Sequence, residues 1–307
     1  MLNYMCRHID KTLVEWKNNP FHKPLLLRGA RQVGKSSAVR HFSEQFEYFA
    51  EVNFERDKDF STFFRGSLDV RLICSKLSNF LQVPIVAGKT LLFFDEIQSC
   101  PEAIMALRFF KEDYPELHVV AAGSLLEFAL QGLPTFGVGR IHSVFMYPMT
   151  FDEFVMANGM EGLLSARNLA DFSHPLDEAF HDKLVEQFRL YLLVGGMPEA
   201  VAMWKTTSDL LQCQRIHDDI MLTYEDDFSK YSRRVSPELL RLALHGVCHQ
   251  IGKKLTYSRI SESLRSYQIR DALDLLTLAG IITPVVPTAA NDFPLAAEAD
   301  ERRVKYL

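Results

Sequence analysis

The stretch Gly29-Ala-Arg-Gln-Val-Gly-Lys-Ser36 follows the apolar run Pro24-Leu-Leu-Leu27 and precedes a helical pattern. Its order of glycine, four free positions, glycine, lysine and serine is that of a phosphate-binding loop. The glycines allow a tight turn that directs backbone N–H groups at phosphate oxygens, and the next helix adds the positive end of its dipole. The stretch therefore predicts a nucleotide polyphosphate site. The alternative is a glycine turn with an exposed lysine.

Each position of this loop has an expected role. We expect Lys35 to reach the β- and γ-phosphates and the Ser36 hydroxyl to be a ligand of Mg²⁺. Ser37 extends the polar edge of the site. The spacing of apolar residues from 36 to 47 predicts a helix with one buried face directly after the loop. The remaining residues expected to contact the nucleotide through the loop are Gly29, Ala30, Arg31, Gln32, Val33 and Gly34.

A second acidic element follows the apolar run Leu91-Leu-Phe-Phe94. Apolar residues at consecutive positions indicate a strand that is covered on both faces, as in parallel sheets. Asp95, at the end of this strand, is the expected Mg²⁺ ligand, directly or through water. Glu96 is the candidate that polarises the attacking water. The alternative is a strand that ends in two solvated carboxylates.

Length and composition are those of a globular protein with more than one domain. The chain has 307 residues, 48% of them hydrophobic, which suffices for ordinary buried cores. Neither a signal peptide nor an apolar run of membrane-spanning length is apparent, so we expect a cytoplasmic protein. The five cysteines are scattered without zinc-like spacing, and we interpret them as reduced structural thiols.

Strand-like segments recur at 24–29, 48–54, 90–95, 117–122 and 141–147, with helical patterns between most of them. This alternation predicts an α/β fold with a parallel sheet. Ser124 follows the fourth segment, where it could sense the γ-phosphate, orient water, or simply close a turn. After Phe154 the strand pattern stops, and helical patterns at about 176–194 and 208–228 predict a helical lid.

The sequence resembles a bacterial and archaeal family of AAA-type ATPases with an uncharacterised C-terminal region. The resemblance spans nearly the whole chain, and its carriers are Arg28-Gly-Ala-Arg-Gln-Val-Gly-Lys35, Asp95-Glu-Ile-Gln-Ser-Cys-Pro101, Ala122-Gly-Ser-Leu-Leu126, Gly137-Val-Gly-Arg140, Tyr147-Pro-Met-Thr-Phe-Asp-Glu-Phe154 and Gly195-Gly-Met-Pro-Glu199. It implies a P-loop NTPase sheet of the AAA/ASCE type, ATP and Mg²⁺ as cofactors, and adenine rather than guanine as the base.

The resemblance also implies roles for two residues outside the loop. Related regulatory ATPases use a Gly-x-Pro motif in the lid to touch adenine, which would put Pro198 against the base. Arg140 is a candidate arginine finger, because a guanidinium can neutralise charge on a transferring phosphoryl group. It could act within its own chain or on a neighbouring subunit, or be a surface arginine in a glycine-rich turn.

The C-terminal region has a different pattern. Helical patterns at 237–251, 258–265 and 268–279, followed by the extended stretch 281–286, predict a winged-helix domain. From Ser229 onward there are twelve Lys/Arg and eight Asp/Glu, a local charge of +4, whereas the preceding part has 22 against 31, or −9. This asymmetry permits DNA contact. The expected recognition helix opposes it, because Asp271 and Asp274 accompany its one arginine, Arg270.

Family members usually continue into a domain resembling restriction endonucleases, whose start resembles Arg302-Arg-Val-Lys-Tyr-Leu307. We therefore expect a fragment or a shortened gene product, with an unpaired final strand.

The predicted divisions are an ATPase core at 1–155, a helical lid at 156–235 and the winged-helix domain at 236–307. The predicted function is an Mg²⁺-dependent ATPase that couples nucleotide state to movement of the lid and the winged helix. The alternatives are a slow nucleotide switch and an ATP-regulated DNA-binding protein. ATP and ADP are the expected ligands, while DNA, a protein partner or a further copy of the chain remain open, and no membrane is expected.

Overall fold

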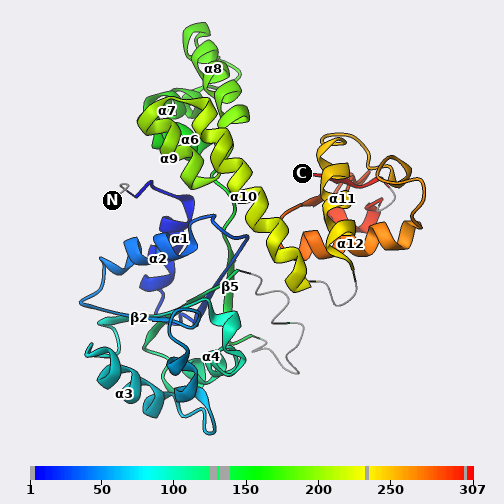
Figure 1. The fold of residues 1–307 in the computed structure, drawn as a ribbon. Coiled ribbons are helices and arrows are strands. Elements are labelled where there is room, and N and C mark those ends of the chain that lie inside the picture. The colour runs from blue at the N-terminus through cyan, green and yellow to red at the C-terminus, as the bar shows by residue number, and fades with distance from the viewer. Residues whose placement is uncertain (1–3, 125–129, 131–138, 232–234, 301–302) are drawn as a thin grey trace. The chain divides into compact units, whose positions relative to one another are not determined.

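The computed structural model describes residues 4–124, 130, 139–231, 235–300 and 303–307. The chain divides into two compact units, Met1–Asp219 and Ile220–Leu307, and helix α10 (Leu210–Tyr231) crosses the boundary between them (Figure 1). The predicted three-part division of the chain stays a prediction. No helix in the described part of the chain is long and apolar enough to cross a membrane.

The first unit is built on a five-stranded sheet with the strand order β2-β3-β4-β1-β5, and every neighbouring pair of strands is parallel. The predicted parallel α/β fold is therefore confirmed. The central position of β4, between β1 and β3, decides which loops meet at the carboxyl edge of the sheet. The strands are β1 (Leu25–Arg28), β2 (Tyr48–Asn53), β3 (Thr90–Asp95), β4 (His118–Ala122) and β5 (His142–Phe145).

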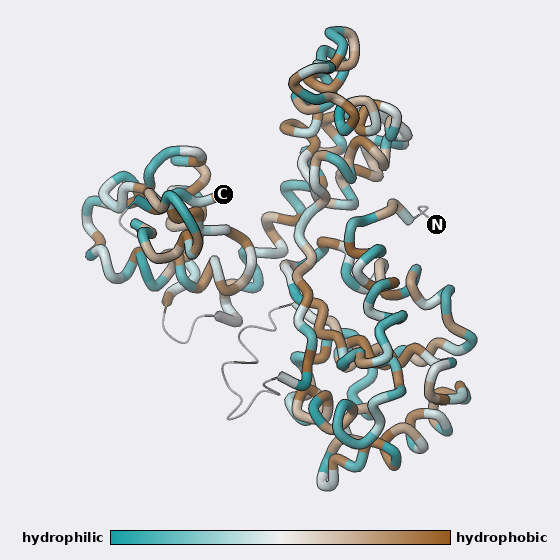
Figure 2. Tube along the Cα trace, turned by 180° about the vertical axis from the view of Figure 1, so that it is seen from behind, coloured by the Kyte–Doolittle hydropathy of each residue, from teal (hydrophilic) through white to brown (hydrophobic). Residues whose placement is uncertain are grey.

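Helices cover both faces of this sheet, and each face has its own buried cluster. In β3, Leu92 and Phe94 point into one cluster, while Leu91 and Phe93 point into the other. This division explains why the strand is apolar at consecutive positions, since side chains alternate between faces and both faces are covered. In Figure 2 the central strands are mostly brown, whereas the helices alternate between brown and teal.

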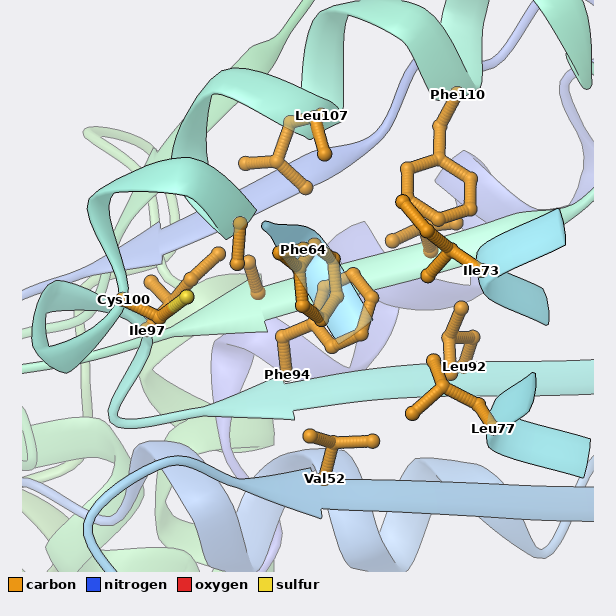
Figure 3. Close-up of a cluster of buried hydrophobic side chains, with 14 of the residues drawn as sticks. Val52, Phe64, Ile73, Leu77, Leu92, Phe94, Ile97, Cys100, Leu107 and Phe110 are labelled. Atoms are coloured by element: carbon orange, nitrogen blue, oxygen red, sulfur yellow. The ribbon is translucent and has the colours of Figure 1, made fainter. Parts of the chain in front are cut away.

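The first cluster packs under η1 (Lys58–Phe64), α3 (Val70–Leu81) and α4 (Pro101–Asp113). Figure 3 shows Phe64, Phe94 and Phe110 meeting there with aliphatic side chains from the strands and helices. The ring of Phe94 lies 5.6 Å from that of Phe64 and 5.8 Å from that of Phe110, between ring centroids. Truncation of one such ring to alanine costs about 3–5 kcal/mol. The second cluster packs under α1 (His8–Asn18) and α2 (Lys35–Ser43).

The helical part of the first unit follows β5. Its helices are α6 (Phe151–Ala157), α7 (Glu161–Leu169), α8 (Glu178–Val194), α9 (Pro198–Thr207) and the first part of α10. Val155, Leu164 and Leu184 form a small buried cluster that joins the first three. Thr150 and Glu153 cap α6 reciprocally, each accepting from the other's backbone N–H. The helical patterns expected at 176–194 and 208–228 correspond to α8 and α10.

The second unit contains α11 (Pro237–Cys248), α12 (Ser266–Leu278) and a short antiparallel pair, β6 (Pro284–Val285) and β7 (Lys305–Tyr306). The helix expected at 258–265 is absent from the described residues, and only the short turn η3 (Tyr257–Arg259) forms there. The Ser261 hydroxyl accepts from the backbone N–H of Ser263, a local bond that competes with helix formation. The winged helix therefore stays a prediction. The expectation of an unpaired last strand is wrong, because β7 pairs with β6.

Candidate functional site

The phosphate loop connects β1 to α2 and is held in an unusual backbone conformation. Gly29 and Gly34 have φ angles of 142° and 97°, and Gln32 has a φ of 63°. A Cβ atom on Gly29 would lie 2.1 Å from the carbonyl oxygen of Met146, so only glycine fits there. Gln32 adopts the left-handed region despite its side chain, which costs conformational energy. The conformation of the loop therefore depends on three residues with positive φ and on the close approach of the Met146 backbone to Gly29.

Lys35 lies inside this loop and is largely buried. Its Nζ donates to the carbonyl oxygens of Gly29, at 2.9 Å, and Ala30, at 2.6 Å. Burial lowers the pKa of Lys35 to about 8, although the carboxylates of Glu96 and Asp95 oppose the shift. The loop thus contains a cation that is poorly solvated and held by neutral carbonyl groups, an arrangement that favours an incoming anion.

Asp95 meets the loop from the end of β3. Ser36 Oγ donates to Asp95 Oδ1 at 2.8 Å, and Asn53 Nδ2 donates to Asp95 Oδ2 at 3.2 Å. Arg40 Nη2 lies 3.5 Å from the same Oδ2. Burial raises the pKa of Asp95 above its ordinary value, although the hydrogen bond from Ser36 opposes the rise. The predicted pair of Mg²⁺ ligands is therefore adjacent.

These groups fit an Mg²⁺ ion. Mg²⁺ is bound in nucleotide sites by one or two protein oxygens together with water and substrate phosphates. Ser36 and Asp95 supply a hydroxyl and a buried carboxylate in contact with each other. A divalent cation would also offset the cost of holding the Asp95 charge away from water.

Glu96 follows Asp95 with a φ of 50°, in the left-handed region. Gln98 Nε2 donates to Glu96 Oε2 at 2.6 Å. Ser124 Oγ lies 3.5 Å from the same oxygen, and Arg31 Nε donates to that hydroxyl at 3.2 Å. Because β4 lies between β1 and β3, Ser124 stands between the phosphate loop and Glu96. A chain of polar contacts therefore runs from Arg31 through Ser124 to Glu96.

Arg140 lies elsewhere. Its Nε donates to Glu112 Oε1 at 3.0 Å, and Arg108 binds the same carboxylate oxygen at 2.9 Å. Arg140 precedes β5, and Glu112 lies in the last turn of α4, the helix that leads into β4. In a parallel sheet the starts of the strands share one edge and their ends share the other. Arg140 is therefore at the edge opposite the phosphate loop of its own chain, where it does not join the other candidates.

Pro198 begins α9 and lies close to the loop. Its Cγ is 3.6 Å from the position that a Cβ atom on Gly34 would occupy, and Met146 Cε and Arg7 Nη1 lie at the same distance. Nearby, Met149 N donates to Gly196 O at 2.6 Å, and Tyr191 Oη donates to Met149 O at 2.7 Å. The stretch that precedes α9 is therefore attached to the residues between β5 and α6.

The remaining loop positions also lie together. Ala30 and Val33 are buried, while Gln32 and Ser37 are exposed. The residues expected in the site therefore come from the phosphate loop and from the ends of β3 and β4, and Pro198 lies beside the loop. Arg140 is the exception. No sequence motif assigned a role to Arg7, Arg40, Asn53, Gln98 or Glu153. Gln98 and Glu153 fall inside the quoted motifs, which was the available signal for those two.

The strand order, the phosphate loop after β1 and the acidic pair after β3 give the first unit the P-loop fold of AAA-type domains. Residues 21–155 match a family described as an AAA domain. Residues 185–307 match a family described as a domain of unknown function. No curated protein matches the sequence.

A solved structure with a TM-score above 0.5 supports this fold. The chain is similar to the Walker-type ATPase PABY2304 of Pyrococcus abyssi, with a TM-score of 0.58, 17% identity, and coverage of 92% of this chain and 91% of that chain. Weaker similarity extends to the Aeropyrum pernix ORC1 protein in complex with DNA, with a TM-score of 0.36, 14% identity, and coverage of 97% and 87%. Only the first similarity is strong enough to support the fold.

Proposed function

We propose that this protein binds ATP together with Mg²⁺ and hydrolyses it. The observation that carries the proposal is the contact between Ser36 of the phosphate loop and Asp95 of β3, 2.8 Å apart. It brings the phosphate-binding element and the acidic element together at one edge of the sheet. Two such elements in contact are far more specific than either motif alone.

The residues of this site divide the work of phosphoryl transfer. Lys35 binds the β- and γ-phosphates and neutralises their charge, while Ser36 and Asp95 hold the metal. Mg²⁺, when bound, neutralises charge that develops on the phosphate oxygens. Glu96 aligns the attacking water and accepts its proton, and Ser124 contacts the γ-phosphate from the neighbouring strand. These roles are the ones that in-line attack of water on the γ-phosphate would require.

The helical part of the first unit acts as a lid in this proposal. Pro198 packs against the base of ATP, supported by its closeness to Gly34. The hydrogen bond between Met149 and Gly196 supports a mechanical link between the end of the sheet and the lid. In this proposal a change of bound nucleotide moves α9, and α10 transmits that movement to the second unit.

Arg140 acts on a nucleotide held by a neighbouring copy of the chain. Its position at the start of β5, on the edge away from its own phosphate loop, supports action between subunits. The exposed pair with Glu112 leaves it at the surface, with a side-chain exposure of 51%. DNA binding is not part of the proposal, because the exposed residues of α12 include Asp271 and Asp274 beside Arg270.

The test is titration with fluorescent ATP and GTP analogues plus Mg²⁺, followed by phosphate release. Lys35→Ala is expected to abolish nucleotide binding, because it removes the cation that faces the phosphates. Glu96→Gln is expected to keep ATP binding and reduce turnover by about 100-fold or more, the usual contribution of a general base. Lys89→Ala is the matched control, since Lys89 is exposed and pairs with Glu47 outside the site.

Unchanged ATP affinity in Lys35→Ala would remove the proposed site. Tight ATP binding without turnover in the wild type would favour the slow nucleotide switch instead. The engagement of the Glu96 carboxylate by Gln98 is the observation that favours this second candidate. A glutamate held by a donor is less available to accept a proton from water.

A further inference from the structure

Arg7 has no role in any nucleotide motif, yet its side chain reaches three separate segments of the first unit. Nη1 donates to the carbonyl oxygen of Val33 at 2.9 Å, inside the phosphate loop. Nη2 donates to the carbonyl oxygen of Tyr147 at 2.7 Å. Nε donates to Glu153 Oε1 at 3.1 Å. The side chain is 5% exposed, so these contacts are formed away from water.

The contact with Val33 fixes the direction of the next N–H group. Among the described residues the one cis peptide bond is Phe293–Pro294, so the bond between Val33 and Gly34 is trans. In a planar trans peptide, the C=O and N–H bonds point in opposite directions. Because the Val33 carbonyl points at Arg7, the Gly34 N–H points away from Arg7.

The Gly34 N–H is available to a ligand. Among the described residues it donates to no acceptor, and Gly34 has a φ of 97°, which side chains rarely tolerate. In phosphate loops, N–H groups of this kind bind phosphate oxygens. A glycine peptide without an external contact can rotate, and rotation would turn a carbonyl oxygen toward the phosphates. The Arg7 contact prevents this rotation.

The other end of Arg7 is anchored equally well. Glu153 Oε1 also accepts from the backbone N–H of His8 at 2.6 Å, and Oε2 accepts from that of Thr150 at 2.7 Å. Burial alone would raise the pKa of Glu153. The backbone hydrogen bonds from Thr150 and His8 and the charge of Arg7 together lower it. Glu153 is thus a fixed anion that both caps α6 and holds the guanidinium.

We propose that Arg7 is the positioning residue of the phosphate loop. It orients the Val33–Gly34 peptide toward the phosphates and ties that peptide to Glu153, at the start of the first lid helix. This inference rests on the proposed function, because it assumes that the loop binds phosphates. Arg7 itself does not touch the nucleotide. The base of the nucleotide gains nothing from the orientation of this peptide, whereas each phosphate-bearing ligand does.

The experiment compares Arg7→Lys with the wild type in binding of MgATP, MgADP and adenosine. Lysine keeps a positive charge beside Glu153 but lacks the planar fork that reaches three acceptors. Arg167→Lys is the matched control. Arg167, in α7, pairs with Asp152, which lies in α6 next to Glu153, and Arg167 does not touch the loop. Amide hydrogen exchange of the peptide spanning 29–36 is measured without nucleotide in all three proteins.

We expect Arg7→Lys to weaken MgATP and MgADP binding by about 10- to 100-fold, the effect of losing a hydrogen bond from a charged group. Adenosine affinity should stay within about twofold, which corresponds to less than 0.5 kcal/mol. Exchange should accelerate at 29–36 in Arg7→Lys and not in Arg167→Lys. Equal losses for adenosine and ATP, or unchanged ATP affinity, would overturn the inference.

Failure of the proposed function has a different signature. If the folded wild type binds neither MgATP nor MgADP, the nucleotide proposal fails, and exchange at 29–36 alone decides the role of Arg7. Unchanged exchange there would overturn it, and faster exchange confined to that peptide would support it. If Arg7→Lys does not fold, the double variant Arg7→Gln/Glu153→Gln removes both buried charges and replaces it in every comparison.

Discussion

Lys35 shows how the site is prepared at the level of single residues. Its ammonium is buried, donates to two carbonyl oxygens of its own loop and has a pKa lowered by desolvation to about 8. A bound phosphate would add negative charge that compensates the ammonium for the hydration it loses on burial. In the free protein this ammonium therefore loses its proton near pH 8, whereas a bound nucleotide would keep it charged.

A dependence of ATP affinity on pH follows from this shift. As pH rises through 8, the free protein loses the Lys35 proton, so binding must take a proton up and becomes weaker. We expect the affinity for MgATP to fall by about tenfold between pH 7 and pH 9. Isothermal titration at both values measures it. Lys35→Arg stays charged throughout and should show a flat profile, and a flat profile in the wild type would contradict the assignment.

The sequence predicted the residues that act through local spacing. Lys35 and Ser36 follow the second glycine of the loop, and Asp95 ends a run of buried apolar residues, so their neighbours along the chain defined them. Arg7 and Asn53 act through contacts with residues distant in sequence, at Val33 and Asp95. Nothing in their own neighbourhood marks them, because the sheet and the capping of α6 create those contacts.

At the level of elements, the stretch before α9 is packed tightly against the end of the sheet. A Cβ atom on Gly196 would lie 2.2 Å from the carbonyl oxygen of Met149, whose N–H donates to Gly196 O. Gly162, in α7, has nothing within 4 Å of the same position. The same added methyl group would therefore meet backbone atoms at Gly196 and open space at Gly162.

Opposite effects are expected from alanine at these two glycines. Gly196→Ala must displace the backbone at Met149 and should destabilise the protein by about 1–3 kcal/mol, as overpacking does. Gly162→Ala should stabilise it by about 0.5–1 kcal/mol, because alanine is the better helix former. Denaturant unfolding of both variants measures the difference. Equal effects at the two positions would argue against tight packing of this stretch.

Element boundaries show where the sequence was informative. The strand expected at 90–95 is β3 without any change of bounds, since consecutive apolar residues ended at an acidic pair. The helix expected at 258–265 contains three serines, and a hydroxyl there binds a nearby backbone N–H instead. β7 has only two residues, and its pairing with β6 depends on how the chain returns, which short-range patterns do not encode.

At the level of the whole molecule, the candidate nucleotide contacts all lie within the first compact unit, Met1–Asp219. They extend from the phosphate loop to Pro198, and the positioning contacts of Arg7 also belong to this unit. Helix α10 continues beyond the boundary to Tyr231. A division of the chain that respects this helix therefore has to fall after it.

The protein shortened to residues 1–231 should keep its affinity for MgATP. We expect a change of no more than about twofold, the range of changes remote from a site. Binding of a fluorescent ATP analogue to the shortened and full-length proteins measures it, and circular dichroism establishes that both are folded. A loss of binding by the folded shortened protein would mean that the second unit contributes directly to the site.

The two buried clusters of the first unit share the same strands, because β1, β3 and β4 each supply side chains to both faces of the sheet. Neither cluster can therefore be dissolved while the other stays intact. Loosening the packing under α4 exposes the strands that also support α2 and the phosphate loop. The sheet makes this unit cooperative, so that damage on the face remote from the nucleotide lowers the fraction of molecules able to bind it.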